Sequence, residues 1–122
     1  MTDHELYERA VAAAQRAYAP YSNYLVGAAL LARDGTVIEG CNVENAAYPL
    51  GVCAETTALA RAVAEGHSPG EFEAIAITAG PCGGCRQWLY EFKIERVTFR
   101  NRAGEIVTRT PAELLPDAWD FD

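Results

Sequence analysis

Two short cysteine motifs carry the side chains best suited to chemistry in this sequence. The first, Cys-Ala-Glu, covers residues 53–55, and the second, Pro-Cys-Gly-Gly-Cys, covers residues 81–85. Each motif falls where a loop should lead into a helix, and a helix N-terminus lowers the pKa of a thiol. Three thiolates from two adjacent helix starts can converge on one Zn²⁺ and leave its fourth position to water. The sequence therefore predicts one zinc ion, with Cys53, Cys82 and Cys85 as its ligands.

Glu55 is the predicted acid–base group of this site. It lies two residues after Cys53, in the first turn of the expected helix, so its carboxylate can face a metal-bound water without being a ligand. Zinc makes hydroxide available near neutral pH. Glu55 could then take the released proton, pass it to a ring nitrogen and assist the departure of ammonia. Together the two motifs are similar to the signature of zinc deaminases, with a cysteine in place of its first histidine.

Three other roles for the cysteines stay open at this point. Cys41 could be the fourth ligand of a structural zinc site, Cys82 and Cys85 could form a redox pair, or Cys53 could be a small buried apolar residue. A carboxylate two residues after Cys53 favours a catalytic site over a structural one. A redox pair formed by Cys82 and Cys85 would not explain the Cys-Ala-Glu motif at residues 53–55. We therefore expect Cys41 not to bind the metal.

The elements that must position these motifs alternate between helix and strand. A capping box at Thr2 and Glu5 starts a helix that Pro20 ends. The patterns that follow predict a hairpin over 24–32 and 36–38, a loop over 41–52, a helix over 53–65, a strand over 72–78, a helix over 82–92, strands over 97–99 and 106–108, and a helix start at 110–113. This order predicts one α/β domain over residues 1–122, with a single mixed β-sheet of about five strands sandwiched by helices.

The composition excludes several classes of function. A formal net charge of −7 argues against a surface that grips nucleic acid. The densest basic cluster is interpreted as a solvated strand edge; it comprises Arg96, Arg100, Arg102 and Arg109. No apolar run approaches the roughly 18 residues that a membrane-spanning helix needs, and the polar N-terminus is unlike a targeting segment. The Cys-x-x-Cys spacing favours a reducing compartment. We expect a cytoplasmic protein with no nucleic-acid or membrane partner.

Beyond the two motifs, nearly the whole chain resembles the small homotetrameric cytidine deaminases of pyrimidine salvage. The matching blocks, in the order of the family, are residues 20–22, 26–31, 42–51, 53–55 and 81–87. The resemblance implies a zinc-dependent hydrolase that converts cytidine and 2′-deoxycytidine to the uridines plus ammonia. It also implies a small-molecule nucleoside substrate and a homotetramer whose sites are shared between subunits.

The same resemblance implies roles for residues that bind the substrate. Asn42 and Glu44 match the pair that hydrogen-bonds the 3′-hydroxyl of the ribose, although both could also be ordinary turn residues. The backbone of Ala54 and the carboxylate of Glu55 match the groups that bind the pyrimidine edge. Tyr24 takes the place of an aromatic side chain that packs against the substrate.

Three departures from the family pattern lie around the metal and the amino-group side of the substrate. Thr56 stands where the family usually has an arginine whose charge offsets the thiolates, and only the Thr56 hydroxyl and Arg86 could compensate. The connection over residues 78–80 is several residues shorter than in typical members. Trp119 stands near the C-terminal aromatic, typically a phenylalanine, that reaches into a neighbouring subunit's site; it could equally be surface packing.

These departures shape the expected substrate range. A shorter wall before the second cysteine motif should leave the exocyclic position of the base more open, so we expect relaxed acceptance of 4-substituted cytidines. The alternative functions are a deaminase of a cytosine-containing antibiotic such as blasticidin S, a nucleic-acid-editing deaminase, and a zinc-stabilised binding module without catalysis. The retained ribose block argues against the first, and the acidic composition argues against the second.

Overall fold

The computed structural model describes residues 1–121. Its centre is a mixed five-stranded sheet in the order β2-β1-β3-β4-β5, which confirms the predicted fold class. The strands are β1 (Gly27–Ala32), β2 (Val37–Cys41), β3 (Phe72–Ile77), β4 (Arg96–Arg100) and β5 (Ile106–Arg109). β3 and β4 are parallel, whereas every other neighbouring pair is antiparallel. A parallel pair needs a crossover connection, and α3 provides it.

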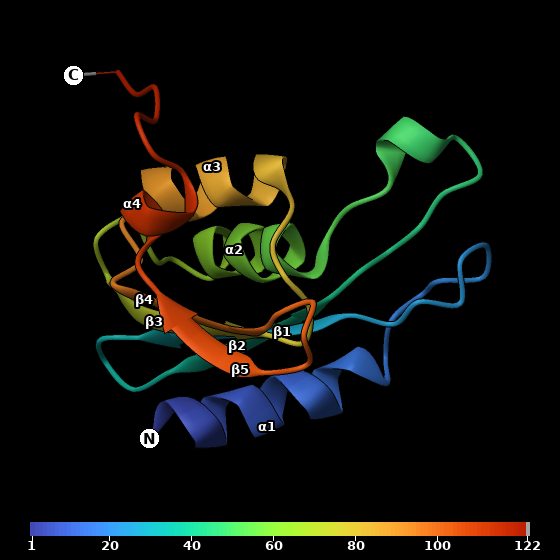
Figure 1. Ribbon diagram of the computed structural model, residues 1–122, viewed down its shortest axis with the longest axis horizontal. Coiled ribbons are helices and arrows are strands. Elements are labelled where there is room, and N and C mark those ends of the chain that lie inside the picture. Colours follow the sequence, from blue (N-terminus) through green and yellow to red (C-terminus); the bar gives the residue numbers. More distant parts are fainter. Residues whose placement is uncertain (122) are drawn as a thin grey trace.

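Helices cover both faces of this sheet. Helix α1 (Asp3–Ala14) lies along one face, and α2 (Ala54–Ala64), α3 (Gly83–Glu91) and α4 (Pro111–Leu114) lie on the other (Figure 1). None of these helices, over residues 1–121, is both long and apolar enough to span a membrane. The two helices whose N-termini carry the cysteine motifs therefore lie on the same side of the sheet.

Strand β1 is buried on both sides because the two hydrophobic layers meet across it. Leu30 belongs to the cluster beneath α2 and α3, whereas Leu31 belongs to the cluster beneath α1. Two glycines allow the helices to approach the strands closely. A Cβ on Gly27 would lie 2.0 Å from the carbonyl oxygen of Ala10 in α1, and a Cβ on Gly40 would lie 2.5 Å from the backbone nitrogen of Ala58 in α2. The start of α2 is thus held firmly against β2.

The first helix is shorter than the sequence pattern predicts. It ends at Ala14. From Tyr18 onward the backbone forms hydrogen bonds with the loop that follows β2. The backbone N–H of Tyr18 donates to the carbonyl of Asn42, and the Tyr18 carbonyl accepts from the N–H of Glu44. The predicted strand from residue 24 likewise begins only at Gly27. Before Gly27, the Asn42 side chain accepts from the N–H of Val26 and donates to the carbonyl of Tyr24, so contacts with the loop after β2 replace strand pairing there as well.

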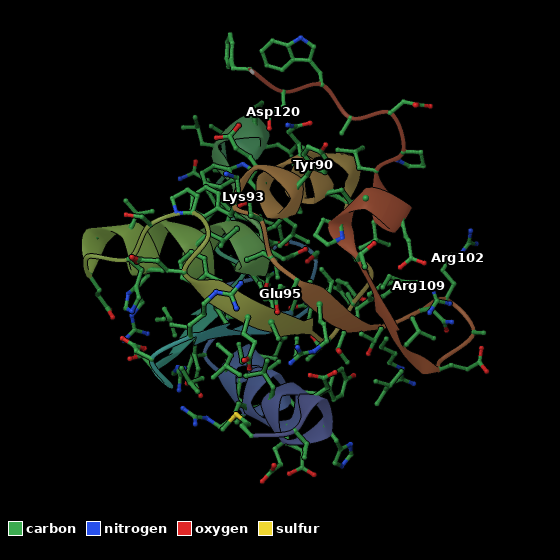
Figure 2. The ribbon with its side chains drawn as sticks, turned by 90° about the vertical axis from the view of Figure 1, so that its left-hand side faces the viewer. Tyr90, Lys93, Glu95, Arg102, Arg109 and Asp120 are labelled. Carbon is green, nitrogen blue, oxygen red and sulfur yellow. The ribbon has the colours of Figure 1, made fainter. Side chains whose placement is uncertain are left out.

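The basic cluster at the sheet edge is largely open to solvent. Arg100, Arg102 and Arg109 are exposed, and Figure 2 shows Arg102 and Arg109 beside the β4–β5 hairpin. Arg96 instead pairs with Asp3 of α1 at 3.2 Å. This arrangement agrees with the interpretation of the cluster as a solvated strand edge.

Candidate metal centre and substrate cavity

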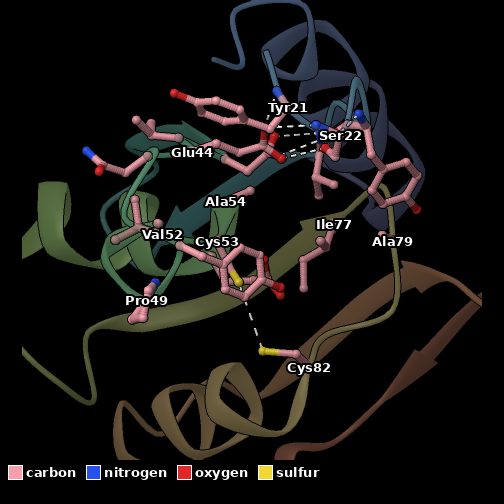
Figure 3. A pocket seen from close by; sticks show the side chains of 18 of the residues that line it. Tyr21, Ser22, Glu44, Pro49, Val52, Cys53, Ala54, Ile77, Ala79 and Cys82 are labelled. Atoms are coloured by element: carbon pink, nitrogen blue, oxygen red, sulfur yellow. Dashed lines mark hydrogen bonds between the residues drawn. The ribbon is translucent and has the colours of Figure 1, made fainter. Parts of the chain in front are cut away.

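The three predicted metal ligands come together between the N-termini of α2 and α3. Cys53 is the N-cap residue of α2, Cys82 is the N-cap residue of α3, and Cys85 lies in the first turn of α3. Their three Sγ atoms all lie within 4.8 Å of one another, and those of Cys53 and Cys82 are 4.0 Å apart (Figure 3). Tetrahedral coordination at a Zn–S distance of about 2.3 Å implies sulfurs about 3.8 Å apart. The donor set and its spacing thus fit zinc.

The fourth cysteine does not belong to this cluster. Cys41 ends β2 and is absent from the group of ligand side chains that could hold a metal in the described part of the chain. All four cysteines are free thiols. The three remaining cysteines can leave one coordination position open, as catalytic zinc sites do.

The protein environment shifts the pKa values of the three thiols in different directions. Burial raises the pKa of Cys85 and, less strongly, that of Cys53. Burial also acts to raise the pKa of Cys82, but hydrogen bonds, first that of the Cys85 backbone N–H at 3.4 Å, outweigh it and lower the pKa. Thiols with raised pKa values are poor anions by themselves. A divalent cation would offset this cost, because a coordinated thiol is deprotonated outright.

Glu55 is a buried carboxyl group beside the sulfur cluster. Its side chain lies in the first turn of α2, and the residue is only 3% exposed. Burial raises the pKa of Glu55. A carboxyl group with a raised pKa that lines a cavity is suited to taking up and releasing a proton during a reaction.

A cavity of about 830 Å³ opens in front of these groups. This substrate cavity lies between the loop after β2, the start of α2 and the segment that joins β3 to α3 (Figure 3). Its volume is within the usual range for small-molecule sites. Five residues that the sequence assigns to catalysis or substrate binding line it, namely Tyr24, Asn42, Glu44, Ala54 and Glu55. The metal centre and the predicted ribose site thus open into one space.

Asn42 and Glu44 also hold the cavity wall together. The Asn42 Oδ1 accepts from the backbone N–H of Val26 at 2.8 Å, and its Nδ2 donates to the carbonyl of Tyr24 at 2.9 Å. The Glu44 carboxylate accepts from the backbone N–H groups of Tyr21 and Ser22 and from the Ser22 hydroxyl. That hydroxyl lowers the pKa of Glu44, which therefore stays ionised.

Sequence reasoning missed Tyr21 and Ser22 as cavity residues. Both line the cavity, and Ser22 contacts the predicted ribose-binding carboxylate directly. The block over residues 20–22 contains both residues, but its residue types alone assign neither side chain a role.

Comparison with known proteins agrees with this geometry. Residues 1–101 match the family model described as the cytidine and deoxycytidylate deaminase zinc-binding region. The chain belongs to this family. A cytidine deaminase of Sporosarcina psychrophila is 46% identical over 88% of this chain and 83% of its own length. A cytidine deaminase of Halalkalibacterium halodurans is 45% identical over 93% of this chain and 91% of its own length.

A solved structure gives the same result for the fold. The crystal structure of a cytidine deaminase from Burkholderia pseudomallei is 49% identical and has a TM-score of 0.91. The match covers 98% of this chain and all of that one. The sheet and the helices that position the cysteine motifs are therefore those of a cytidine deaminase fold.

At the metal centre, Thr56 stands where the family resemblance leads us to expect an arginine. Its Oγ1 lies 4.0 Å from the Sγ of Cys85, at the long end of hydrogen bonding to sulfur. Arg86 does not take over the role of the missing arginine. Its guanidinium donates to the backbone carbonyls of Pro81 at 3.0 Å and Leu114 at 2.9 Å, which fastens α4 to the start of α3. The polar groups close to the sulfurs are thus the backbone N–H of Cys85 and the Thr56 hydroxyl.

Trp119 does not line the cavity of its own chain. The residue is 64% exposed and is absent from the cavity lining. Its ring packs edge-on against Phe121, with centroids 4.4 Å apart, and its carbonyl accepts from the Gln87 side chain. The C-terminal tail extends away from the sheet beyond α4 (Figure 1). Trp119 therefore cannot contact a substrate in the same subunit in this conformation.

Proposed function

We propose that this protein deaminates cytidine and 2′-deoxycytidine by hydrolysis, giving uridine or 2′-deoxyuridine and ammonia. The observation that carries the proposal is the single cavity shared by Glu55, the cysteine cluster and the pair Asn42 and Glu44. A catalytic zinc site and a ribose-binding pair are both needed only if a nucleoside is the substrate. The two cytidine deaminases at 45% and 46% identity support this assignment.

Glu55 is the proposed proton carrier of the reaction. Zinc, when held by Cys53, Cys82 and Cys85, would supply a Lewis acid that makes hydroxide available near neutral pH. Glu55 takes a proton from the attacking water and delivers it to N3 of the pyrimidine. A second transfer to the exocyclic nitrogen allows ammonia to leave. The backbone N–H of Ala54, at the first position of α2, has no partner within the helix and is available to the base.

The sugar is proposed to bind at the opposite part of the cavity. Asn42 and Glu44 hydrogen-bond the 3′-hydroxyl, and Tyr24, which is 62% exposed at the cavity edge, packs against the substrate. A free ribose at this position argues against a cytosine-containing antibiotic as the main substrate. The net charge of −7 argues against a nucleic-acid substrate.

We further propose a cytoplasmic homotetramer in which neighbouring subunits complete the cavity. Large apolar side chains are exposed at its rim, including Tyr48 at 91% and Tyr21 at 61%. Exposed apolar groups that gather around one site are typical of surfaces covered by a partner. Trp119 of one subunit is proposed to reach the cavity of another. Light scattering coupled to size-exclusion chromatography tests the assembly, and a monomer at micromolar concentration would contradict it.

The decisive test measures the loss of cytidine absorbance with the zinc-loaded protein and its Glu55→Gln variant. The variant should retain zinc and the fold, because Glu55 is not a ligand, but lose roughly 10²- to 10⁴-fold in kcat. Zinc content and circular dichroism provide the control. Normal turnover by this variant would refute the acid–base role, whereas no turnover by the unchanged protein would refute the deaminase function and favour a binding module.

A further inference from the structure

We propose that Ser22 is a positioning residue for the sugar end of the substrate cavity, and that its hydroxyl orients the Glu44 carboxylate for the 3′-hydroxyl of the nucleoside. This inference rests on the proposed deaminase function and deepens it, because it names the part of the substrate that Ser22 serves. Ser22 lines the cavity and contacts Glu44 directly. It therefore acts on the substrate through Glu44.

The Ser22 hydroxyl joins two residues that are proposed to bind the substrate. Its O–H donates to Oε2 of Glu44, and its oxygen accepts from the backbone N–H of Tyr24 at 3.0 Å. The carbonyl of Tyr24 in turn accepts from the Asn42 side chain at 2.9 Å. A continuous chain of hydrogen bonds thus connects Glu44 to Asn42 through the segment that precedes β1.

A tight turn directs the donors of this segment toward one carboxylate. The backbone N–H groups of Tyr21 and Ser22 both donate to Oε1 of Glu44, at 2.9 and 3.1 Å (Figure 3). Asn23 follows with a φ of 59°, in the left-handed region. Successive N–H groups beside a left-handed residue form a concavity that binds anions. The backbone thus holds one oxygen of Glu44, and among the described hydrogen bonds only that of the Ser22 hydroxyl holds the other.

The hydroxyl is needed because a carboxylate held at one oxygen can still rotate about its terminal bond. Torsions of this kind are broad and are not confined to narrow wells. With Ser22 bound to Oε2, the remaining lone pairs of Glu44 keep one direction, and the 3′-hydroxyl binds without the cost of ordering them. Loss of the Ser22 hydroxyl should therefore weaken binding of the 3′-hydroxyl, whereas the base and the metal centre should be unaffected.

The loop after β2 should keep its place without this hydroxyl. Its backbone is joined to Tyr18 by two hydrogen bonds, one through the carbonyl of Asn42 at 3.0 Å and one through the N–H of Glu44 at 2.8 Å. The Asn42 side chain also accepts from the N–H of Val26 at 2.8 Å. Ser22 is exposed, so Ser22→Ala leaves no cavity in the core. The variant is therefore expected to fold and to bind zinc as the unchanged protein does.

The experiment compares cytidine with 3′-deoxycytidine, which lacks the hydroxyl that Glu44 is proposed to bind. The value of kcat/KM is measured for both nucleosides with the zinc-loaded protein and with its Ser22→Ala variant. The variant should lose about tenfold on cytidine and less than about twofold on 3′-deoxycytidine, as expected for one hydrogen bond to a charged group at a site open to water. Ser22→Thr retains the hydroxyl and should keep the preference for cytidine.

Tyr21→Phe is the matched control for this comparison. It removes a hydroxyl from the neighbouring cavity residue but keeps the backbone N–H that donates to Glu44. The preference for cytidine over 3′-deoxycytidine should therefore be unchanged. In a Glu44→Ala background, Ser22→Ala should alter this preference by less than about twofold, because residues that act through one contact are not additive.

The outcomes separate this inference from the proposals beneath it. An equal loss on both nucleosides in Ser22→Ala, or the same loss of preference in Tyr21→Phe, would overturn the role of Ser22 alone. A full additional effect of Ser22→Ala in the Glu44→Ala background would do the same. An unchanged protein that shows no preference for cytidine would overturn the assignment of the sugar to Glu44 as well. Turnover of neither nucleoside would overturn the deaminase function itself.

Discussion

The Thr56 hydroxyl should strengthen zinc binding through the most buried of the three sulfurs. Cys85 is 3% exposed. Among the described hydrogen bonds, the one side-chain hydroxyl near its Sγ is that of Thr56, at 4.0 Å. Thr56→Val keeps the shape and the branched Cβ but removes this donor. Because the two residues have similar helix propensities, the start of α2 should stay intact.

The size of the effect can be worked from the contact. A hydrogen bond to a charged group contributes about 1.5–3 kcal/mol. The oxygen–sulfur distance of 4.0 Å is long, so about 1 kcal/mol is expected, which corresponds to roughly fivefold in affinity. Removal of groups that support metal ligands typically costs 10- to 100-fold. We therefore expect zinc to bind Thr56→Val about five- to tenfold more weakly.

The assay is competition for zinc with a chromophoric chelator, with Thr56→Ser as the variant that restores the hydroxyl. Thr57→Val is the matched control, because the Thr57 hydroxyl donates to the Cys53 carbonyl and not to a sulfur. An unchanged zinc affinity in Thr56→Val, or an equal loss in Thr57→Val, would refute the reasoning. Thr56→Arg tests the charge argument in the other direction, and faster cytidine deamination is expected if the guanidinium fits beside the thiolates.

Two further predictions concern the scaffold that holds the site. Gly40→Ala should lower the free energy of unfolding by about 1–3 kcal/mol or more in urea titrations, because its Cβ would lie 2.5 Å from the Ala58 backbone nitrogen. Glu39→Gln should cost about 1–2 kcal/mol at pH 7, because Arg16, assisted by Arg9, lowers the pKa of Glu39. The native stabilisation is lost as the pH falls through that lowered pKa, so the difference between the two proteins should shrink in acid and persist at neutral pH.

The metal centre could be predicted from the sequence because its determinants are local. Cys53 and Cys82 each mark a helix start, and Cys85 and Glu55 follow within one helical turn. The fold class followed from the alternation of helix and strand patterns for the same reason. Even the absence of Cys41 from the cluster was predictable, since no motif accompanies it.

Features that depend on distant partners could not be predicted. The early end of α1 arises from backbone hydrogen bonds between Tyr18 and the loop after β2. No sequence pattern near Ala14 indicates these hydrogen bonds. Arg86 looked available to the thiolates, but the carbonyl of Leu114, far along the chain, binds its guanidinium. The proposed role of Trp119 in a neighbouring subunit stays a prediction, because Trp119 does not line the cavity of its own chain.

The hydrogen bonds that hold Asn42 and Glu44 also explain how this pair can serve the substrate. A carboxylate offers about four acceptor positions, and three donors of Tyr21 and Ser22 occupy Glu44. The Asn42 amide uses one acceptor position for Val26 and one N–H for Tyr24, which leaves an N–H and a lone pair. Each side chain is thus fixed in orientation by the loop and keeps a free position. A ribose hydroxyl that donates to Glu44 and accepts from Asn42 would complete both groups without displacing a wall contact, so the proposed sugar site would be organised before the sugar binds.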